Sequence, residues 1–212
     1  MTFNSFQFAL FFPVVYMLYL VLKHRWQNRM LLVASCVFYG AWDWRFLGLM
    51  FVSITTDFLC AQAIHRASPR RRKLFLAVNL VVSLGILGFF KYFNFFAGSL
   101  ENRLSFWGIH PHYAVLKIIL PVGISFYTFQ AMSYAFDVYR GTLVPVPSYW
   151  DYALFVTYFP HLVAGPIMKA RDLLPQVIYP RTLSWEKFYS GCYLIFRGLF
   201  QKMFVVDNLW LL

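Results

Sequence analysis

His161 is the residue of this sequence whose possible chemistry is simplest to state, because an imidazole can act as a general base near neutral pH. It lies in the segment Tyr158-Phe-Pro-His-Leu-Val-Ala-Gly-Pro-Ile167, whose prolines and Gly-Pro pair predict a bent backbone. A pocket-lining element needs such a backbone, and many ordinary loops share it. A single histidine without a recognisable partner is commonly structural, so catalytic, pocket-lining and structural interpretations all stay open.

A second group of polar side chains lies in the apolar segment 120–140. Ser125 and Thr128 fall on one helical stripe with Met132, and Gln130 falls on a different face. These side chains could line a tunnel, or they could form the hydrogen bonds between helices that are ordinary in membranes. The sequence does not decide between the two.

Three charged residues are the remaining candidates. Asp57 lies inside an apolar run, where an acid is costly and usually faces a partner in the bundle interior. It is either a site residue or a structural hydrogen-bonding group. Asp137 and Arg140 are spaced i, i+3 and could form an interfacial ion pair.

Motifs of soluble enzymes are absent from the sequence. It contains no P-loop, GxGxxG, HExxH or GxSxG pattern. Cys36, Cys60 and Cys192 each lie in an apolar run, without CxxC or Cys/His metal spacing. Buried, inert thiols are therefore expected, with no metal site and no bound cofactor.

The composition is that of a membrane protein. Hydrophobic residues make up 60% of the 212 residues and charged residues only 13%, against about 25% in soluble domains. The net charge is +11, but the basic residues fall between apolar runs rather than along one face. That distribution argues against nucleic-acid binding and follows the preference for Lys and Arg in cytoplasmic loops.

Five apolar runs predict membrane spans, of which the second is short. They cover residues 6–22, 30–42, 46–64, 74–90 and 114–138. No charge precedes Lys23, so the first run is expected to be a retained span rather than a signal peptide. Lys91-Tyr92 and Asn94 indicate a membrane boundary, followed by a polar loop at 98–113.

Orientation follows from the basic loops. Placing Arg66–Lys73 in the cytoplasm puts the 23–29 loop and Arg140 inside. The N-terminus, the 43–45 turn and the 98–113 loop are then outside. Both strongly basic stretches fall on the same side without adjustment, which supports a multi-pass protein of the inner membrane with five spans.

The pattern changes after Arg140, where six prolines interrupt the chain. The apolar piece Tyr152–Ala164 is too short to cross a bilayer and predicts a re-entrant or surface-lying segment that lines a cavity. Ser184 is expected to cap a helix that has Glu186 in its first turn and runs to about Val206.

The last residues predict that the chain is one part of a longer protein. Asp207-Asn208 breaks the helix, and the sequence stops inside a new apolar run at Leu209–Leu212. The expected fold is therefore an all-α, polytopic transmembrane bundle with a re-entrant or interfacial segment, truncated at its C-terminus.

Several of these stretches resemble one known family. Leu120-Pro-Val-Gly-Ile-Ser-Phe-Tyr-Thr-Phe-Gln130, with Tyr134 and Asp137-Val-Tyr-Arg140, resembles a signature of membrane-bound O-acyltransferases of the alginate O-acetylase type. The segment 159–167 resembles that branch's second signature. Further similar stretches are Phe11-Phe-Pro13, Ser35-Cys-Val-Phe-Tyr39, and Gly198-Leu-Phe-Gln-Lys202 with Asp207-Asn208. The resemblance covers essentially all of residues 1–212 and implies the N-terminal part of one membrane-embedded acyltransferase domain.

The resemblance implies transfer of an acyl group from a cytoplasmic thioester donor such as acetyl-CoA. The group would pass through a central tunnel to a hydroxyl of an exported polysaccharide or to a periplasmic acetyltransferase partner. The family's invariant histidine would be the general base; it is expected beyond Leu212, and His161 does not match it. The tunnel-lining candidates are Ser125, Thr128, Gln130, Asp137, Arg140 and His161. The chain alone is expected to be inactive.

Two alternatives remain. A transporter or channel component would also use broken helices, but the sequence shows no internal repeat and few ionisable residues in its spans. A D-alanyl transferase acting on teichoic acids belongs to the same superfamily. The Phe-Tyr-Thr-Phe-Gln and His-Leu-Val-Ala-Gly-Pro stretches fit the alginate O-acetylase branch better.

Overall fold

The computed structural model describes residues 3, 5–106, 119–162, 165–166 and 168–206, and in this part of the chain every regular element is a helix. The all-α prediction is confirmed. The elements are α1 (Phe6–Val21), α2 (His24–Asp43), α3 (Arg45–Arg66), α4 (Pro69–Phe106), α5 (Ile124–Arg140), α6 (Tyr149–Thr157), α7 (Phe159–Leu162), α8 (Ala170–Ile178), α9 (Trp185–Phe200) and a final π-helical turn (Gln201–Val206).

Some sequence predictions fall outside the described residues. They concern the second half of the 98–113 loop, the first residues of the fifth apolar run, part of the 159–167 signature, and the helix break and apolar run at 207–212.

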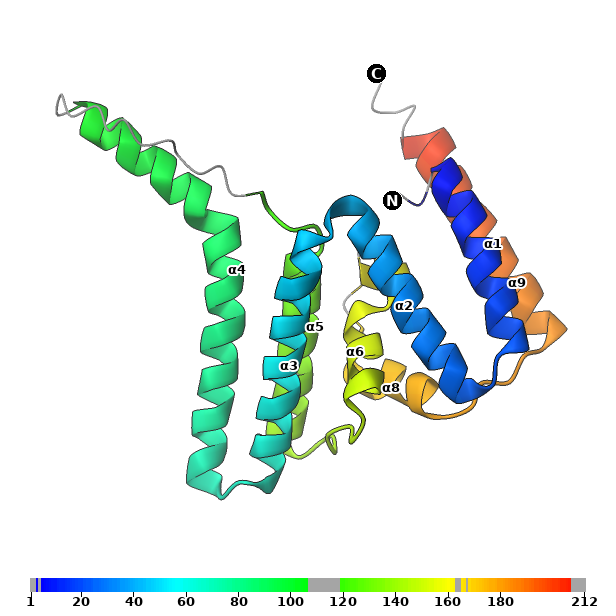
Figure 1. Ribbon diagram of the computed structural model, residues 1–212, viewed down its shortest axis with the longest axis horizontal. Helices are drawn as coiled ribbons and strands as arrows, with labels where there is room; N and C mark the ends of the chain where they lie inside the picture. Colours follow the sequence, from blue (N-terminus) through cyan, green and yellow to red (C-terminus); the bar gives the residue numbers. More distant parts are fainter. Residues whose placement is uncertain (1–2, 4, 107–118, 163–164, 167, 207–212) are drawn as a thin grey trace.

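The first five helices alternate in direction along the chain (Figure 1). As a result, the α1–α2 connection, the α3–α4 turn and the end of α5 all lie at one end of the molecule. This end, called the basic end below, carries the stretches 23–29 and 66–73 together with Arg140. The alternation that the loop charges predict is therefore present in the fold.

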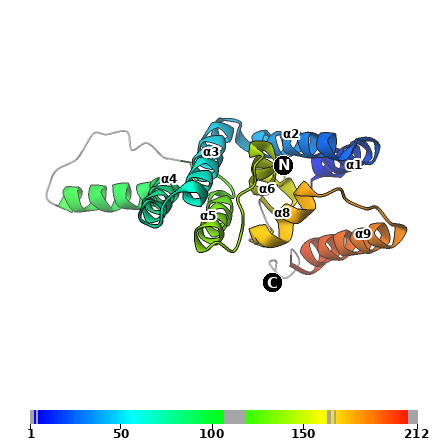
Figure 2. The ribbon, with the colours of Figure 1, turned by 90° about the horizontal axis from the view of Figure 1, so that it is seen from below.

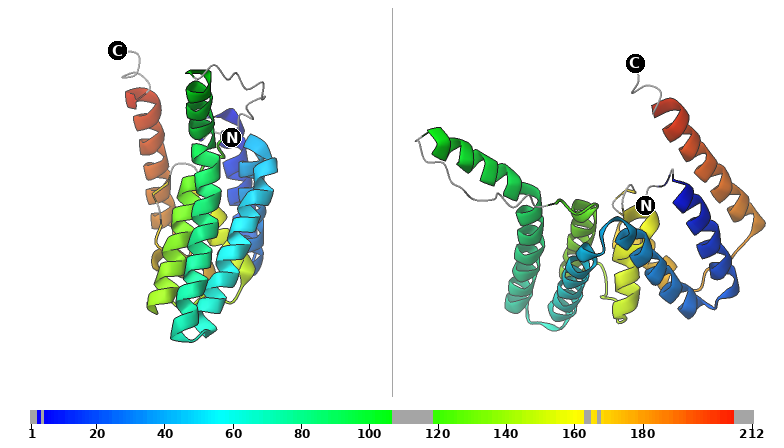
Figure 3. Two further views of the ribbon diagram at one scale, coloured as in Figure 1. Left: turned by 90° about the vertical axis from the view of Figure 1, so that its left-hand side faces the viewer. Right: turned by 45° about the horizontal axis from the view of Figure 1, so that its top comes forward.

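Two short helices fill the middle of the molecule. α6 packs against α2, α3 and α8, and α7 against α2. Seen from below, α6 and α8 lie between α5 on one side and α1 with α2 on the other (Figure 2). The last part of α4 bends away from the other helices (Figures 1 and 3).

Among the described residues, two helices are long and apolar enough to cross a membrane: α3, and residues 69–100 of α4. α1 is a shorter apolar helix of 16 residues. The side chains that face outward from these elements are largely apolar, and Leu59 and Val81 are among the most exposed. By length and composition, these helices are suited to cross a membrane.

The helix that contains the second apolar run is longer than that run. α2 has 20 residues and begins at His24, so most of the basic 23–29 stretch is helix rather than loop. Arginine and glutamine are good helix formers, and their long stems tolerate a membrane boundary. Gln27 donates to the Tyr19 carbonyl across the connection, at 2.9 Å, which ties the start of α2 to the end of α1.

The limits of the next spans also differ from prediction. α4 does not end near the expected boundary at 91–94 but continues as helix through Phe106 into the predicted polar loop, and no proline interrupts it there. α5 begins only at Ile124, well inside the predicted fifth run, because Pro121-Val-Gly123 forms a turn first. It has 17 residues, or about 25 Å of helix.

The 43–45 turn is built as an ion pair. Arg45 contacts the Asp43 carboxylate at 2.7 Å and donates to it through its backbone and guanidinium groups. These hydrogen bonds from Arg45 lower the pKa of the Asp43 carboxyl. Trp42 stacks on Phe46 across the turn, at 5.5 Å between ring centroids, as expected for an aromatic anchor.

The last predicted helix is confirmed. Ser184 caps α9 by accepting a hydrogen bond from the Lys187 amide at 3.3 Å, and Glu186 lies in the first turn. None of the residues of α9 is buried; the helix lies at the edge of the molecule (Figures 1 and 2), where its Phe188 stacks on Tyr16 of α1.

Gly123 and Gly141 make a matched pair for a stability test. Both have a positive φ, +76° and +74°, but a Cβ on Gly123 would lie 2.6 Å from the Leu162 carbonyl oxygen, whereas one on Gly141 meets nothing within 4 Å. Gly141→Ala should lower the free energy of unfolding by about 1 kcal/mol, and Gly123→Ala by about 3 kcal/mol. Thermal unfolding in detergent measures both. Equal losses of unfolding free energy in the two variants would show that α7 does not pack against the 121–123 turn.

Candidate functional site

The centre of the candidate site is a helix that breaks inside the molecule. α6 has nine residues, about 14 Å of helix, which is too short to cross a bilayer. It begins near the basic end and stops at Tyr158, and α7 follows for one turn before the chain reaches α8, again near the basic end (Figure 1). All residues from Tyr152 to Thr157 are buried. This part of the segment is therefore enclosed by the neighbouring helices.

The break removes the helical hydrogen bond between the Phe159 amide and the Phe155 carbonyl, and side chains of two other helices take its place. In a continuous helix the Phe159 amide would donate to the Phe155 carbonyl, four residues earlier. Instead, Gln130 of α5 donates to the Phe155 carbonyl at 2.8 Å, and the Phe159 amide donates to the hydroxyl of Ser35 in α2 at 3.2 Å. Pro160 has no amide hydrogen, which makes a continuous helix unfavourable here.

The segment that leads into α6 is also held by side chains that bond to its backbone. The Val146 amide donates to the Tyr134 hydroxyl at 3.0 Å, and Gln62 donates to the Val146 carbonyl at 2.7 Å. Ser148 then caps α6 by accepting from the Asp151 amide. Side chains of α3 and α5 thus satisfy irregular backbone that water could not reach.

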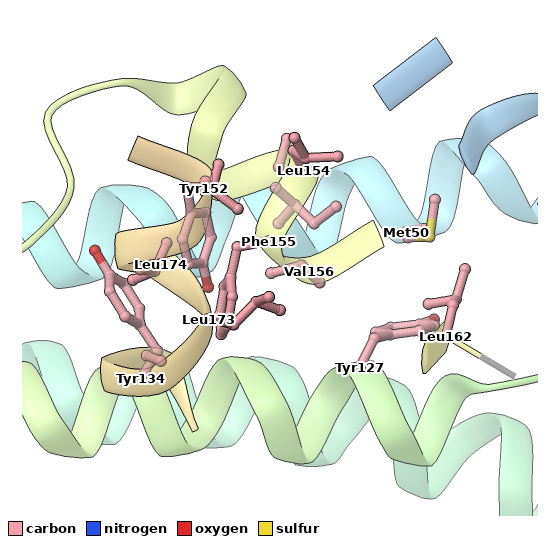
Figure 4. Packing of buried hydrophobic residues seen from close by; sticks show 14 of the residues in the cluster. Met50, Tyr127, Tyr134, Tyr152, Leu154, Phe155, Val156, Leu162, Leu173 and Leu174 are labelled. Atoms are coloured by element: carbon pink, nitrogen blue, oxygen red, sulfur yellow. The ribbon is translucent and has the colours of Figure 1, made fainter. Parts of the chain in front are cut away.

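Aromatic rings surround the start of α7. The Phe159 ring lies edge-on to Phe11 of α1, with 5.5 Å between centroids, and tilted against Phe38 of α2, at 5.6 Å. On the other side, the Leu162 carbonyl touches Gly123. Figure 4 shows Tyr127 of α5 reaching toward Leu162, and Tyr152 and Phe155 of α6 packed with Leu173 of α8. Residues from four of the stretches that carry the family resemblance, at 11–13, 35–39, 120–130 and 159–162, therefore meet at one place.

A cavity of about 330 Å³ opens beside the break. Its lining comes from α1, α2, α6, α7, α8 and Arg181, and consists of Phe12, Tyr16, Tyr19, Leu31, Leu154, Tyr158, Phe159, Pro160, Leu173, Gln176, Val177 and Arg181. The lining is mainly apolar, with a single guanidinium. Because it includes Tyr19 and residues of α8, the cavity lies toward the basic end.

Arg181 is fixed in the cavity wall by three contacts. It donates to the Gln176 carbonyl at 2.6 Å and to the Asn28 side-chain oxygen at 2.5 Å, and it lies over the Tyr19 ring. Asn28 in turn donates to the Val177 carbonyl and to Asp151. The network joins α2, α6 and α8 and holds one positive charge at the cavity.

The structure separates the predicted site residues. Thr128 and Gln130 are buried in α5, Ser125 is partly buried, and Gln130 holds the α6 backbone. His161 is buried in α7, beside the Tyr158 ring, and its Nε2 has no hydrogen-bond partner among the described residues. None of these predicted residues lines the 330 Å³ cavity. The two residues that precede His161, Phe159 and Pro160, do line it.

The predicted ion pair between Asp137 and Arg140 does not form. The ion pairs in the described part of the chain join Arg45 to Asp43 and Arg171 to Asp172. Arg140 is the last residue of α5 and is exposed, where water solvates a guanidinium and an isolated pair gains little.

Asp57 is the centre of a buried hydrogen-bond cluster between α3 and α4. It accepts from the Asn79 amide at 2.6 Å, from Ser83 at 3.1 Å and from Ser53 at 3.5 Å. All four side chains are buried. Of the two interpretations of Asp57, the geometry supports the structural one, because the carboxyl ties the two longest apolar helices together.

Some buried polar groups remain without partners in the described residues. They include the hydroxyls of Tyr39, Tyr127 and Tyr152. These tyrosines come from α2, α5 and α6, the helices around the break. Water or a polar substrate group is the ordinary partner of such buried hydroxyls.

Sequence reasoning missed several residues of this site. Ser35 was noted only as part of a family-like stretch, and Gln62, Asn28 and Arg181 were not singled out. A polar residue inside an apolar run is the available signal for Gln62, whereas Asn28 lies in the basic 23–29 stretch and carries no such signal. Nothing in the sequence indicates that Arg181 faces a cavity, since it lies in a basic stretch.

Comparison with known proteins gives a consistent result. The chain is 40% identical over 208 residues to a probable alginate O-acetylase AlgI of Azotobacter vinelandii, covering 97% of this chain and 41% of the relative. It is 41% identical over 209 residues to a probable alginate O-acetylase AlgI of Pseudomonas aeruginosa, covering 97% of this chain and 39% of that protein. It is 31% identical over 230 residues to a peptidoglycan O-acetyltransferase of Helicobacter pylori, covering 93% and 43%.

The matches have clear limits. The chain spans about two fifths of the length of these relatives. No family model matches the chain, and no solved structure matches it.

The fold and the site together define an all-helical membrane protein with a broken helix enclosed in its core. Nearly the whole chain aligns with proteins named as O-acetylases. It belongs to the membrane-bound O-acyltransferase family, the family of the alginate O-acetylases.

Removing the Asp57 carboxylate tests its structural role. Asp57→Leu leaves the Asn79 and Ser83 donors without an acceptor and should lower the free energy of unfolding by about 2–4 kcal/mol. Asp57→Asn keeps one acceptor oxygen and should cost about half as much. The control is Thr56→Val, which loses only a bond to the Val52 carbonyl of its own helix. If Asp57→Leu unfolds at the same temperature as the control, the cluster does not join α3 to α4.

Proposed function

We propose that this chain is part of a membrane-bound O-acetyltransferase that esterifies hydroxyl groups of an exported polysaccharide. The observation that carries the proposal is the alignment of 97% of the chain, at about 40% identity, with proteins named as alginate O-acetylases. The relatives reported above are all named for O-acetylation, which does not favour a transporter, a channel or a D-alanyl transferase.

The membrane arrangement that we propose has five spans, α1 to α5, with α6 and α7 as a re-entrant segment. The alternating directions of the five helices support it, as does the grouping of the basic stretches at one end. By the preference of Lys and Arg for the cytoplasm, the basic end faces inward and the N-terminus faces outward, in the inner membrane.

The acyl donor that we propose is a thioester such as acetyl-CoA, entering from the cytoplasm. The 330 Å³ cavity supports this assignment, because it lies toward the basic end and has an apolar lining with one guanidinium. A slender thioester arm suits an apolar slot, and a fixed arginine suits a developing negative charge. We assign Arg181 an orienting role there, held in place by Asn28 and the Gln176 carbonyl.

The reaction is attack of a hydroxyl oxygen on the thioester carbonyl, with release of the thiol. It needs a base to take the hydroxyl proton. We assign no residue of this chain to that role, and we assign His161 to the wall of the site, where it packs against Tyr158. The acceptor class is the hydroxyl of a polysaccharide such as alginate or peptidoglycan, reached directly or through a periplasmic acetyltransferase partner.

Blocking the cavity tests the donor assignment. Gln176 is exposed at the cavity, and only its backbone carbonyl holds Arg181, so Gln176→Trp should fill the cavity without unfolding α8. The measurement is ester-linked acetate on the exported polysaccharide of cells that express the full gene with this substitution. It should fall by about tenfold or more relative to cells with the unmodified gene.

The matched control is Ile178→Trp, which adds the same ring to an exposed position of α8 outside the cavity lining. It should leave acetylation unchanged. Normal acetylation in Gln176→Trp would rule out this cavity as the donor path. Normal acetylation after deletion of the gene would contradict the proposed function itself.

A further inference from the structure

The turn between α3 and α4 forms a pocket that acetyl transfer does not use. It has a volume of about 340 Å³ and is lined by Ala63, Arg66, Ala67, Ser68, Arg71 and Phe75. The turn lies in the most basic stretch of the chain, from His65 to Lys73. Two of its arginines line the pocket, and the other basic side chains of the stretch do not.

Arg72 explains why the turn has a fixed shape. Its Nε donates to the Ala67 carbonyl at 3.1 Å, and its Nη2 reaches the His65 carbonyl at 3.5 Å. These carbonyls are among those at the C-terminal end of α3 that have no helical partner. The Arg72 guanidinium therefore bonds to the end of α3 and fixes the turn. In this turn, Arg66 and Arg71 line one pocket.

Arg66 and Arg71 have no acidic partner in the described part of the chain. The sequence has no Asp or Glu between Asp57 and Glu101, so the local charge is uncompensated. Two exposed guanidinium groups at one pocket match the geometry of a phosphate, which accepts paired N–H bonds.

The position of the pocket identifies the source of the phosphate. α3 and the first part of α4 are the two helices that are long and apolar enough to cross a membrane, so the turn between them lies at a membrane surface. Arg71, Leu74 and Val78 lie on one stripe of α4 at i, i+3 and i+7. Leu74 is 60% exposed and Val78 43%, so apolar surface continues from the pocket toward the hydrocarbon.

We infer that this pocket binds the phosphate of an anionic phospholipid headgroup, with Arg66 and Arg71 as its ligands and the lipid chains along Leu74 and Val78. The apolar stripe favours a lipid over a soluble phosphate. Clustered basic residues beside a span attract anionic lipid in general. The pocket adds a specific site within that cluster. The inference does not depend on the proposed acetyl transfer.

The experiment compares two double variants that remove the same charge from the same turn. Arg66→Gln with Arg71→Gln empties the pocket, whereas Arg70→Gln with Lys73→Gln leaves its lining intact. Native mass spectrometry of the purified chain in detergent measures retained phosphatidylglycerol, with phosphatidylcholine as the neutral comparison. The pocket variant should bind phosphatidylglycerol about tenfold more weakly than the unmodified chain, and the control variant within about twofold of it.

The outcomes separate a site from diffuse attraction. Equal losses in the two variants would mean that only the summed charge of the turn matters, and would overturn the inference. Displacement of phosphatidylglycerol by millimolar glycerol phosphate would also overturn it, since the pocket would then hold soluble phosphate. If the double variant does not fold, Arg71→Gln against Arg70→Gln gives the same comparison, with a loss of about fivefold expected only for Arg71→Gln.

Discussion

The structure depends on how one interrupted helix satisfies its backbone away from water. At Tyr158 the chain leaves the helical path, and the bond between the Phe159 amide and the Phe155 carbonyl is lost. Inside an apolar bundle each unpaired group costs several kcal/mol, so a break is stable only where other groups take its place. Ser35 accepts from the amide and Gln130 donates to the carbonyl, which fixes α2 and α5 on opposite sides of the break. Gly123 provides the room for the Leu162 carbonyl.

This constraint links the fold to the proposed acetyl transfer. A helix that stops halfway leaves space beside its end, and the cavity with Arg181 is that space. It also leaves the interior with buried hydroxyls, those of Tyr39, Tyr127 and Tyr152, that have no protein partner in the described residues. A continuous helix would fill the space with packed side chains. The break therefore suits a site that must admit a thioester and a hydroxyl group, while the Asp57 cluster keeps α3 and α4 together at its border.

The sequence predicts elements whose signals are local. α3 follows its apolar run closely, Ser184 caps α9 as its position indicates, and Pro160 marks the break. Contacts that depend on distant partners cannot be read from the sequence. Asn28, in the basic start of α2, bonds through its side chain to Val177 and Asp151, more than 120 residues away in sequence. The roles of Gln130 and Ser35 were equally hidden, because the partner of each is a backbone group of a segment that only the fold brings near. The i, i+3 spacing of Asp137 and Arg140 permits an ion pair, but solvent at the helix end removes its advantage.

A double-mutant cycle on Ser35 and Gln130 tests the account most directly. Ser35→Ala and Gln130→Leu should each lower the free energy of unfolding by about 1–3 kcal/mol, because each removes a hydrogen-bond partner from one buried half of the missing bond. With both partners gone, the Phe155 carbonyl and the Phe159 amide can approach each other again, so the double variant should lose clearly less than the sum of the single losses. Thermal unfolding of the four proteins in one detergent gives the coupling. Strictly additive losses, or no loss in Gln130→Leu, would contradict the claim that these two side chains hold the break.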